Sequence, residues 1–233
     1  YFKLMGIIRN QSIKNSISFY IGMSIGAVNT ILIYPNVFND QPEHWGLLSI
    51  LVAYATLIGA FSTLGIPKTF IRFFPTIKEK GELYCLSLIT PLFGFLLACL
   101  GYWLFKSELF VLLSASPLLQ ENFFYIFLLV FFISFYDVLT SISRSYLDAV
   151  TPILLNEVFH KLYCLLILVV HGFKVIDFTT FLQLYVVGFL LKFLVLLAIQ
   201  AYKGNIYFKL SVGALKIKEM LVYGFYVLIG GAS

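Results

Sequence analysis

Six long apolar runs constrain this chain more than any other feature of its sequence. Each covers about 18–24 residues: Ser16–Tyr34, Trp45–Leu64, Leu83–Phe105, Phe123–Tyr146, Ile153–Val170 and Phe178–Ala201. At 1.5 Å per residue, a helix of that length crosses the roughly 30 Å hydrocarbon core of a bilayer. The runs show no period-two alternation, which disfavours membrane-spanning strands. The sequence therefore predicts an all-α polytopic membrane helix bundle with six transmembrane helices.

The composition agrees with the bilayer as the solvent of these runs. Hydrophobic residues make up 61% of the 233 residues and charged residues only 12%, against about 25% charged residues in soluble domains. The formal net charge is +5, which in a soluble protein would suggest a nucleic-acid partner. Here the positive charges are concentrated in the segments between the runs on one predicted side of the membrane. We therefore expect membrane lipids and no nucleic acid as partners.

The distribution of Lys and Arg predicts the orientation. Assigned by loop, thirteen fall on the side of the N-terminus: Lys3, Arg9, Lys14, Lys68, Arg72, Lys78, Lys80, Arg144, Lys161, Lys203, Lys209, Lys216 and Lys218. Only Lys106 and Lys174 fall on the opposite side, and Lys192 lies inside the sixth run. The positive-inside rule then places the N-terminus in the cytoplasm. The basic stretch Ile66–Gly81 becomes a cytoplasmic hinge, in which Pro67, Pro75 and Gly81 are expected to break the helix.

The last residues of the chain echo the first. The segment "IKEMLVYGFYVLIGGAS" aligns with "IKNSISFYIGMSIGAVN", with identities at Ile217/Ile13, Lys218/Lys14, Ile229/Ile25 and Gly230/Gly26. Both segments follow a basic stretch and both would run outward, so we interpret the second as the start of a seventh helix and of a parallel repeat. This predicts a six-helix transporter lobe at residues 1–218 and a truncated second lobe that starts at residues 219–233. We expect the isolated chain to insert without transporting.

Three stretches carry a family resemblance: "MGIIRNQSIKNSISFYIGMSIGAVNTILIYPNVF", "LGIPKTFIRFFP" and "SISRSYLDAVTPILLNEVFHK". They resemble polysaccharide biosynthesis proteins of the oligosaccharide (O-antigen-type) flippase kind, in the multidrug/oligosaccharidyl-lipid/polysaccharide exporter superfamily. The resemblance implies one lobe of a two-lobe transporter around a central cavity. It also implies translocation of a lipid-linked oligosaccharide, carried on undecaprenyl pyrophosphate, across the bacterial cytoplasmic (inner) membrane. Polysaccharide polymerases and glycosyltransferases would be its partners.

Two other functions stay open. A multidrug or cation antiporter of the same superfamily would use the carboxylate of Asp137 more than the cations. A membrane-embedded polysaccharide polymerase or acyltransferase would need a large outward loop, whereas the outward loops here have only about 10–17 residues. No catalytic or phosphate-binding motif is present, so we expect no enzyme, no cofactor and no metal. The cysteines Cys85, Cys99 and Cys164 lack metal-ligand spacing and are expected to be free thiols.

The fourth run carries the clearest candidate site. On a helix, Ser134, Asp137, Thr140, Ser141, Arg144 and Asp148 fall within about 120° of arc. A carboxylate inside a span costs about 2.5–3.5 kcal/mol on insertion scales, so it usually faces a cavity or a partner. The stripe therefore predicts a cavity wall, with contact between helices through Ser and Thr as the alternative.

Other polar residues extend this site. Lys192 lies about as deep in the sixth run as Asp137 does in the fourth, so we expect the two to neutralise each other, directly or through an anion or water. Glu157 and Lys161 are predicted to form an i,i+4 ion pair at the membrane interface.

For a pyrophosphate-bearing substrate, cationic side chains would shield the anion. The candidates are Lys14, Arg72, Arg144 and Lys192. Gly22 and Asn29 lie on one face of the first run, in a stripe of small and polar residues. Tight helix packing is the favoured interpretation of this stripe. We retain Asn29 as a further candidate for the cavity.

Overall fold

The computed structural model describes residues 2–77, 80–113, 116–206 and 217–230, and in these ranges the chain is helical with short turns. Six helical segments are long and apolar enough to span a membrane: Arg9–Val37, Pro42–Thr63, Leu83–Leu112, Phe124–Ser145, Val150–Gly172 and Phe178–Tyr202. This confirms the predicted class, an all-α polytopic bundle. Helices are expected here because an apolar backbone in a bilayer must satisfy its hydrogen bonds within the segment.

The first span is continuous but changes its helical form. Helix α1 (Phe2–Ala27) passes into a π-helical turn, η1 (Val28–Ile33), and then into α2 (Tyr34–Val37). Pro35 follows directly, and a proline cannot donate to the carbonyl four residues earlier and clashes with it. The widened turn at η1 relieves that clash. Turns of this kind are frequent at functional sites, and Asn29 of η1 is buried while Val28, Ile31 and Leu32 are exposed.

The second span, α3 (Pro42–Thr63), ends in a sharp turn. Leu64 and Gly65 have positive φ angles of 46° and 69°, and the short helix α4 (Ile66–Phe73) starts at once. The expected hinge is therefore partly wrong: Pro67 begins a helix instead of breaking one, because the first turn of a helix tolerates proline. Two residues of this stretch, Lys78 and Glu79, lie outside the described residues.

The remaining helices follow in chain order. Helix α5 (Lys80–Leu112) extends past the predicted end at Phe105, where the backbone is kinked, and α6 (Pro117–Asn122) begins after Ser116, whose hydroxyl caps it. The fourth span is α7 (Phe124–Ser145). The fifth is composed of α8 (Val150–Ile153), a second π-helical turn η2 (Leu154–Phe159) and α9 (His160–Gly172). The sixth is α10 (Phe178–Tyr202), capped by Asp177.

The last described helix is α11 (Ile217–Gly230). It occurs where a seventh helix is predicted, and it packs on α4. At this contact the Arg72 guanidinium lies 4.2 Å from the ring centroid of Tyr223. The division into residues 1–218 and 219–233 stays a prediction. The basic residues Lys209 and Lys216 lie outside the described residues.

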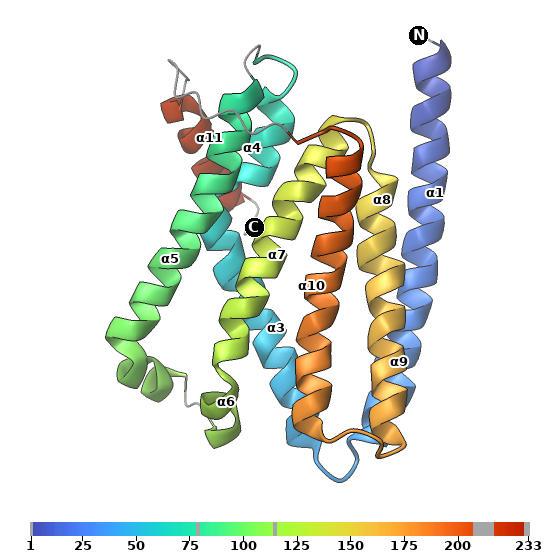
Figure 1. Ribbon diagram of the computed structural model, residues 1–233, viewed down its shortest axis with the longest axis vertical. Coiled ribbons are helices and arrows are strands. Elements are labelled where there is room, and N and C mark those ends of the chain that lie inside the picture. The colour runs from blue at the N-terminus through green and yellow to red at the C-terminus, as the bar shows by residue number, and fades with distance from the viewer. Residues whose placement is uncertain (1, 78–79, 114–115, 207–216, 231–233) are drawn as a thin grey trace.

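Helix α7 organises the bundle. It packs against α3, α10, α4 and α5, whereas α1 rests mainly on α8, η2 and α9 (Figure 1). Buried apolar side chains form two clusters, and α7 contributes to both, with Ile126 in one and Ile142 in the other. The spans alternate in direction, so the turns after α4, α7 and α10 lie at the end that holds the N-terminus of α1 (Figure 1). The predicted basic loops share that end, and their cytoplasmic location stays a prediction.

A polar network fixes the turn between α7 and α8 to the end of α10. Asp148 lies beyond α7 and pairs with Lys203 at 2.6 Å, while Thr151 donates to it through both its N–H and its hydroxyl. Asp148 is thus a turn residue rather than part of the cavity wall. Partial burial tends to raise the pKa of its carboxyl, but the hydrogen bonds from Lys203 and Thr151 outweigh burial and lower that pKa below its ordinary value.

Candidate functional site

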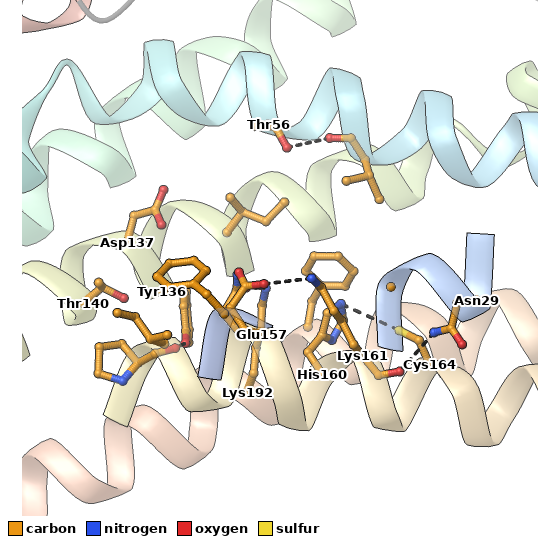
Figure 2. A pocket seen from close by; sticks show the side chains of 18 of the residues that line it. Asn29, Thr56, Tyr136, Asp137, Thr140, Glu157, His160, Lys161, Cys164 and Lys192 are labelled. Carbon is orange, nitrogen blue, oxygen red and sulfur yellow. Dashed lines mark hydrogen bonds and ion pairs between the residues drawn. The ribbon is translucent and has the colours of Figure 1, made fainter. Parts of the chain in front are cut away.

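The helices of the bundle line a half-open cavity of about 570 Å³. Residues from all spans except the third line it, and the two π-helical turns η1 and η2 both contribute. Figure 2 shows how its polar side chains gather from α3, α7, η2, α9 and α10 toward one space. Its charged lining residues are Asp137, Arg144, Glu157, Lys161 and Lys192.

The polar stripe of α7 is in part a cavity wall and in part a helix contact. Asp137, Thr140 and Arg144 line the cavity. Ser134 and Ser141 are buried against neighbouring helices at 1% and 2% exposure. Asp137 and Arg144 are open to the cavity, and within the described part of the chain neither makes a hydrogen bond or an ion pair. Both interpretations of this stripe are therefore correct, for different members of it.

A chain of hydrogen bonds crosses the cavity wall from α10 to α1. Lys192 Nζ donates to Asn156 Oδ1 at 2.8 Å, and Asn156 Nδ2 donates to Glu157 Oε1 at 2.9 Å. Lys161 Nζ then donates to Glu157 Oε2 at 2.8 Å and to the Gly22 carbonyl at 3.1 Å. One bond of this chain, from Lys161 to Glu157, is visible as a dashed line in Figure 2. Four elements, α10, η2, α9 and α1, are joined by it.

The surroundings of Lys192 correct one prediction. Its ammonium is buried, at 4% exposure, and lies 4.9 Å and 4.5 Å from the ring centroids of Tyr136 and Phe189. Among the described residues the ion pairs are Glu157–Lys161 and Asp148–Lys203, so the direct pairing of Lys192 with Asp137 is wrong. The amide of Asn156 takes the place of the carboxylate. Both charges do line one cavity, and a link through an anion or water stays a prediction.

The Glu157–Lys161 ion pair is confirmed, but its location is different from the one expected. The fifth span covers Val150–Gly172, so Lys161 lies near its middle and not at the membrane interface. Removing Lys161 from the loop count leaves twelve Lys and Arg against two, and the predicted orientation is unchanged. A carboxylate and an ammonium at this depth need each other, because either alone would be costly in lipid.

Two of the predicted cations, Lys14 and Arg72, do not line the cavity, whereas the predicted amide of Asn29 does. Lys14 is an exposed residue of α1 that does not line the cavity, and Arg72 stacks on Tyr223 at the contact between α4 and α11. Asn29 does line the cavity and is buried. Its Nδ2 donates to the Lys161 carbonyl at 3.4 Å, and its Oδ1 has no hydrogen-bond partner.

Tyr136 and Asn156 were not among the cavity residues that the sequence predicted. The Tyr136 hydroxyl donates to the Pro152 carbonyl at 2.6 Å, which holds α7 against the start of the fifth span. Asn156 supplies the acceptor for Lys192. A signal for Asn156 was present, because it precedes Glu157 inside an apolar run. The same face continues with His160, whose ring is buried beside Cys164 and Phe189.

The cavity carries three cationic side chains, Arg144, Lys161 and Lys192, against two carboxylates. Its formal charge is therefore positive by one. No family model, no curated protein and no solved structure gives a significant match to this chain. Fold and site together define a multi-pass membrane protein whose helices line a charged, half-open cavity.

Proposed function

We propose that the protein is a transporter that translocates an anionic lipid-linked oligosaccharide across the membrane. The observation that carries this proposal is the surplus cation in a cavity among six membrane-spanning helices. Charged side chains inside membrane spans are costly and are usually retained for a substrate or ion pathway, and Asp137 and Lys192 both lie inside spans and line this cavity. Arg144, in the last turn of α7, is the side chain best suited to bind the anion, because it is open to the cavity and forms no direct ion pair with a carboxylate of the described residues.

The type of substrate follows from the size and charge of the cavity and from the family resemblance. A space of about 570 Å³ is much larger than a phosphate group needs and accommodates sugar rings beside it. Arg144 would bind the pyrophosphate in a bidentate manner. The hydroxyls and amides of Thr56, Thr140 and Asn29 would hydrogen-bond the sugar. The size and charge of the cavity are consistent with a flippase of the oligosaccharide type; the bacterial cytoplasmic membrane and the polysaccharide polymerases and glycosyltransferases as partners are proposed from the family resemblance alone.

A cation antiporter is the second candidate, and Asp137 favours it. This carboxylate faces the cavity without a hydrogen bond or an ion pair in the described residues. A free carboxylate attracts a cation as directly as a free guanidinium attracts an anion. The two functions therefore depend on different residues of one cavity, Arg144 for the flippase and Asp137 for the antiporter.

Reconstitution separates the two functions. The natural full-length protein is placed in proteoliposomes together with a polyprenyl-pyrophosphate-linked oligosaccharide, whose arrival on the far leaflet is measured by lectin accessibility. We expect faster transfer than in empty vesicles and a loss of at least tenfold in Arg144→Gln. Lys14→Gln is the matched control, because it removes a cation from α1 that does not line the cavity. Transfer no faster than in empty vesicles, with uptake of a cationic dye that Asp137→Asn abolishes, would establish the antiporter instead.

A further inference from the structure

A second cavity adjoins the first and differs from it in character. It has a volume of about 1140 Å³ and lies between α3, α4, α7 and α11. Most of its lining is apolar, with Ala53, Leu57, Ala60, Phe61, Ile71 and Phe225 among its side chains. Its volume exceeds the roughly 300–1,000 Å³ of small-molecule pockets. A long hydrocarbon chain fits this combination of size and apolar lining better than a compact polar ligand does.

Two cations line this mostly apolar space, together with Asp137 and several Ser and Thr hydroxyls. Lys68, on α4, and Arg144, on α7, both contribute to its lining, and within the described residues neither is paired with a carboxylate. Asp137 is the one acidic side chain in the lining, so the formal charge is again positive by one. The apolar cavity thus combines hydrocarbon-compatible walls with a net attraction for an anion, a pairing that suits an anionic lipid.

The two cavities meet along α3 and α7. Thr56, Asp137, Thr140 and Arg144 line both of them. A ligand bound at Arg144 can therefore extend a polar part into the smaller cavity and an apolar part into the larger one. The smaller cavity, about 570 Å³, would be mostly unfilled by the headgroup of an ordinary phospholipid. This argues for a lipid phosphate that carries a large polar group.

We infer that the apolar cavity holds the hydrocarbon tail of a polyprenyl-linked phosphate or pyrophosphate, with its phosphate bound between Lys68 and Arg144. This deepens the proposed function and rests on it for the identity of the sugar. It also assigns a role to Lys68, which the sequence did not mark as a site residue. The tail enters the protein beside α11, and the membrane-facing sides of α1 and α5 take no part in binding it.

Binding tests this inference without requiring transport. The full chain in phosphatidylcholine nanodiscs is titrated with polyprenyl pyrophosphate that carries a photoreactive group in its tail. We expect Lys68→Gln and Arg144→Gln each to weaken binding about tenfold or more, the usual loss for a hydrogen bond to a charged group. Lys106→Gln is the charge control, since Lys106 lines neither cavity. We expect photo-cross-links to map to Phe61 and Phe225.

A substitution that fills the cavity guards against effects on folding. Ala60→Trp places an indole in the apolar cavity and should weaken binding, whereas Ala201→Trp, at an exposed position on α10, should not. Cross-links confined to α1 and α5 would show that the tail stays in the bilayer and would overturn the inference. Equal competition by phosphatidylglycerol would also overturn it. So would the finding that a segment of the protein covers α3 and that the tail forms no cross-link there. Tail binding without transfer of the sugar would instead refute the proposed function and leave this site standing.

Discussion

At Gly22 helix α1 comes very close to the fifth span, and the substitution of this glycine is the sharpest test of the packing. A Cβ added to Gly22 would lie 2.6 Å from the Glu157 carbonyl oxygen and 2.8 Å from the Glu157 Cβ. Real Cβ atoms essentially never lie within 3.0 Å of such a neighbour, so Gly22→Ala must separate the two helices by about 0.4 Å or more. The oxygen is backbone and cannot rotate away, and the same shift would lengthen the bond from Lys161 Nζ to the Gly22 carbonyl.

The expected magnitude follows from a matched comparison. Overpacking a well-packed contact costs about 1–3 kcal/mol, while Ala in a helix gains about 0.5–1 kcal/mol over Gly. Gly101→Ala, in the interior of α5, has nothing within 4 Å of the added Cβ and shows the second effect alone. The propensity gain cancels between the two variants. Gly22→Ala should therefore be less stable than Gly101→Ala by about 1–3 kcal/mol.

Thermal unfolding in detergent, followed by size-exclusion chromatography of the heated protein, measures this difference. For a chain of this length, 1 kcal/mol moves the melting temperature by about 2–4 °C, so Gly22→Ala should melt roughly 2–12 °C below Gly101→Ala. Gly26→Ala should resemble the control, because its added Cβ would meet only the Lys161 side chain at 3.5 Å. Equal melting temperatures for Gly22→Ala and Gly101→Ala would refute the close approach of α1 to η2.

Glu157→Gln and Lys161→Met should each lower the melting temperature, and the double variant should recover part of the loss because no unpaired charge remains. Additive losses would contradict this coupling. Because the pKa of Asp148 is lowered in the folded protein, the stability that its carboxylate contributes is present above the unfolded pKa of about 3.9 and is lost as the pH falls through the folded pKa. Asp148→Asn should flatten the acid side of the stability–pH curve, and an unchanged curve would disprove it. With the three native cysteines replaced by serine, an impermeant thiol reagent should label a cysteine at Asn39 from outside and miss one at Thr76; the reverse pattern would invert the orientation.

The sequence by itself determined the class of protein and the number of spans. Hydropathy is a sum over neighbouring residues, so an apolar run of about 20 residues specifies a membrane-spanning helix whatever lies beside it. For the same reason the sequence identified Asp137 and Lys192 as charges inside spans, and Glu157 and Lys161 as an i,i+4 pair. It placed the last pair at the interface, although Lys161 lies near the middle of the fifth run with either the predicted bounds Ile153–Val170 or the observed bounds Val150–Gly172.

The tertiary structure alone decided which charges share a cavity and what each one contacts. The rotation of each helix about its axis and its vertical offset from its neighbours are set by packing, and hydropathy contains neither. Lys192 therefore binds Asn156, 36 residues away, and not the carboxylate at matched depth. Arg72, a cation like Arg144, stacks on Tyr223 between two helices and does not line the cavity, whereas Arg144 does. A local pattern fixes that a charge lies in the membrane, and only the packed bundle fixes which other side chains it meets there.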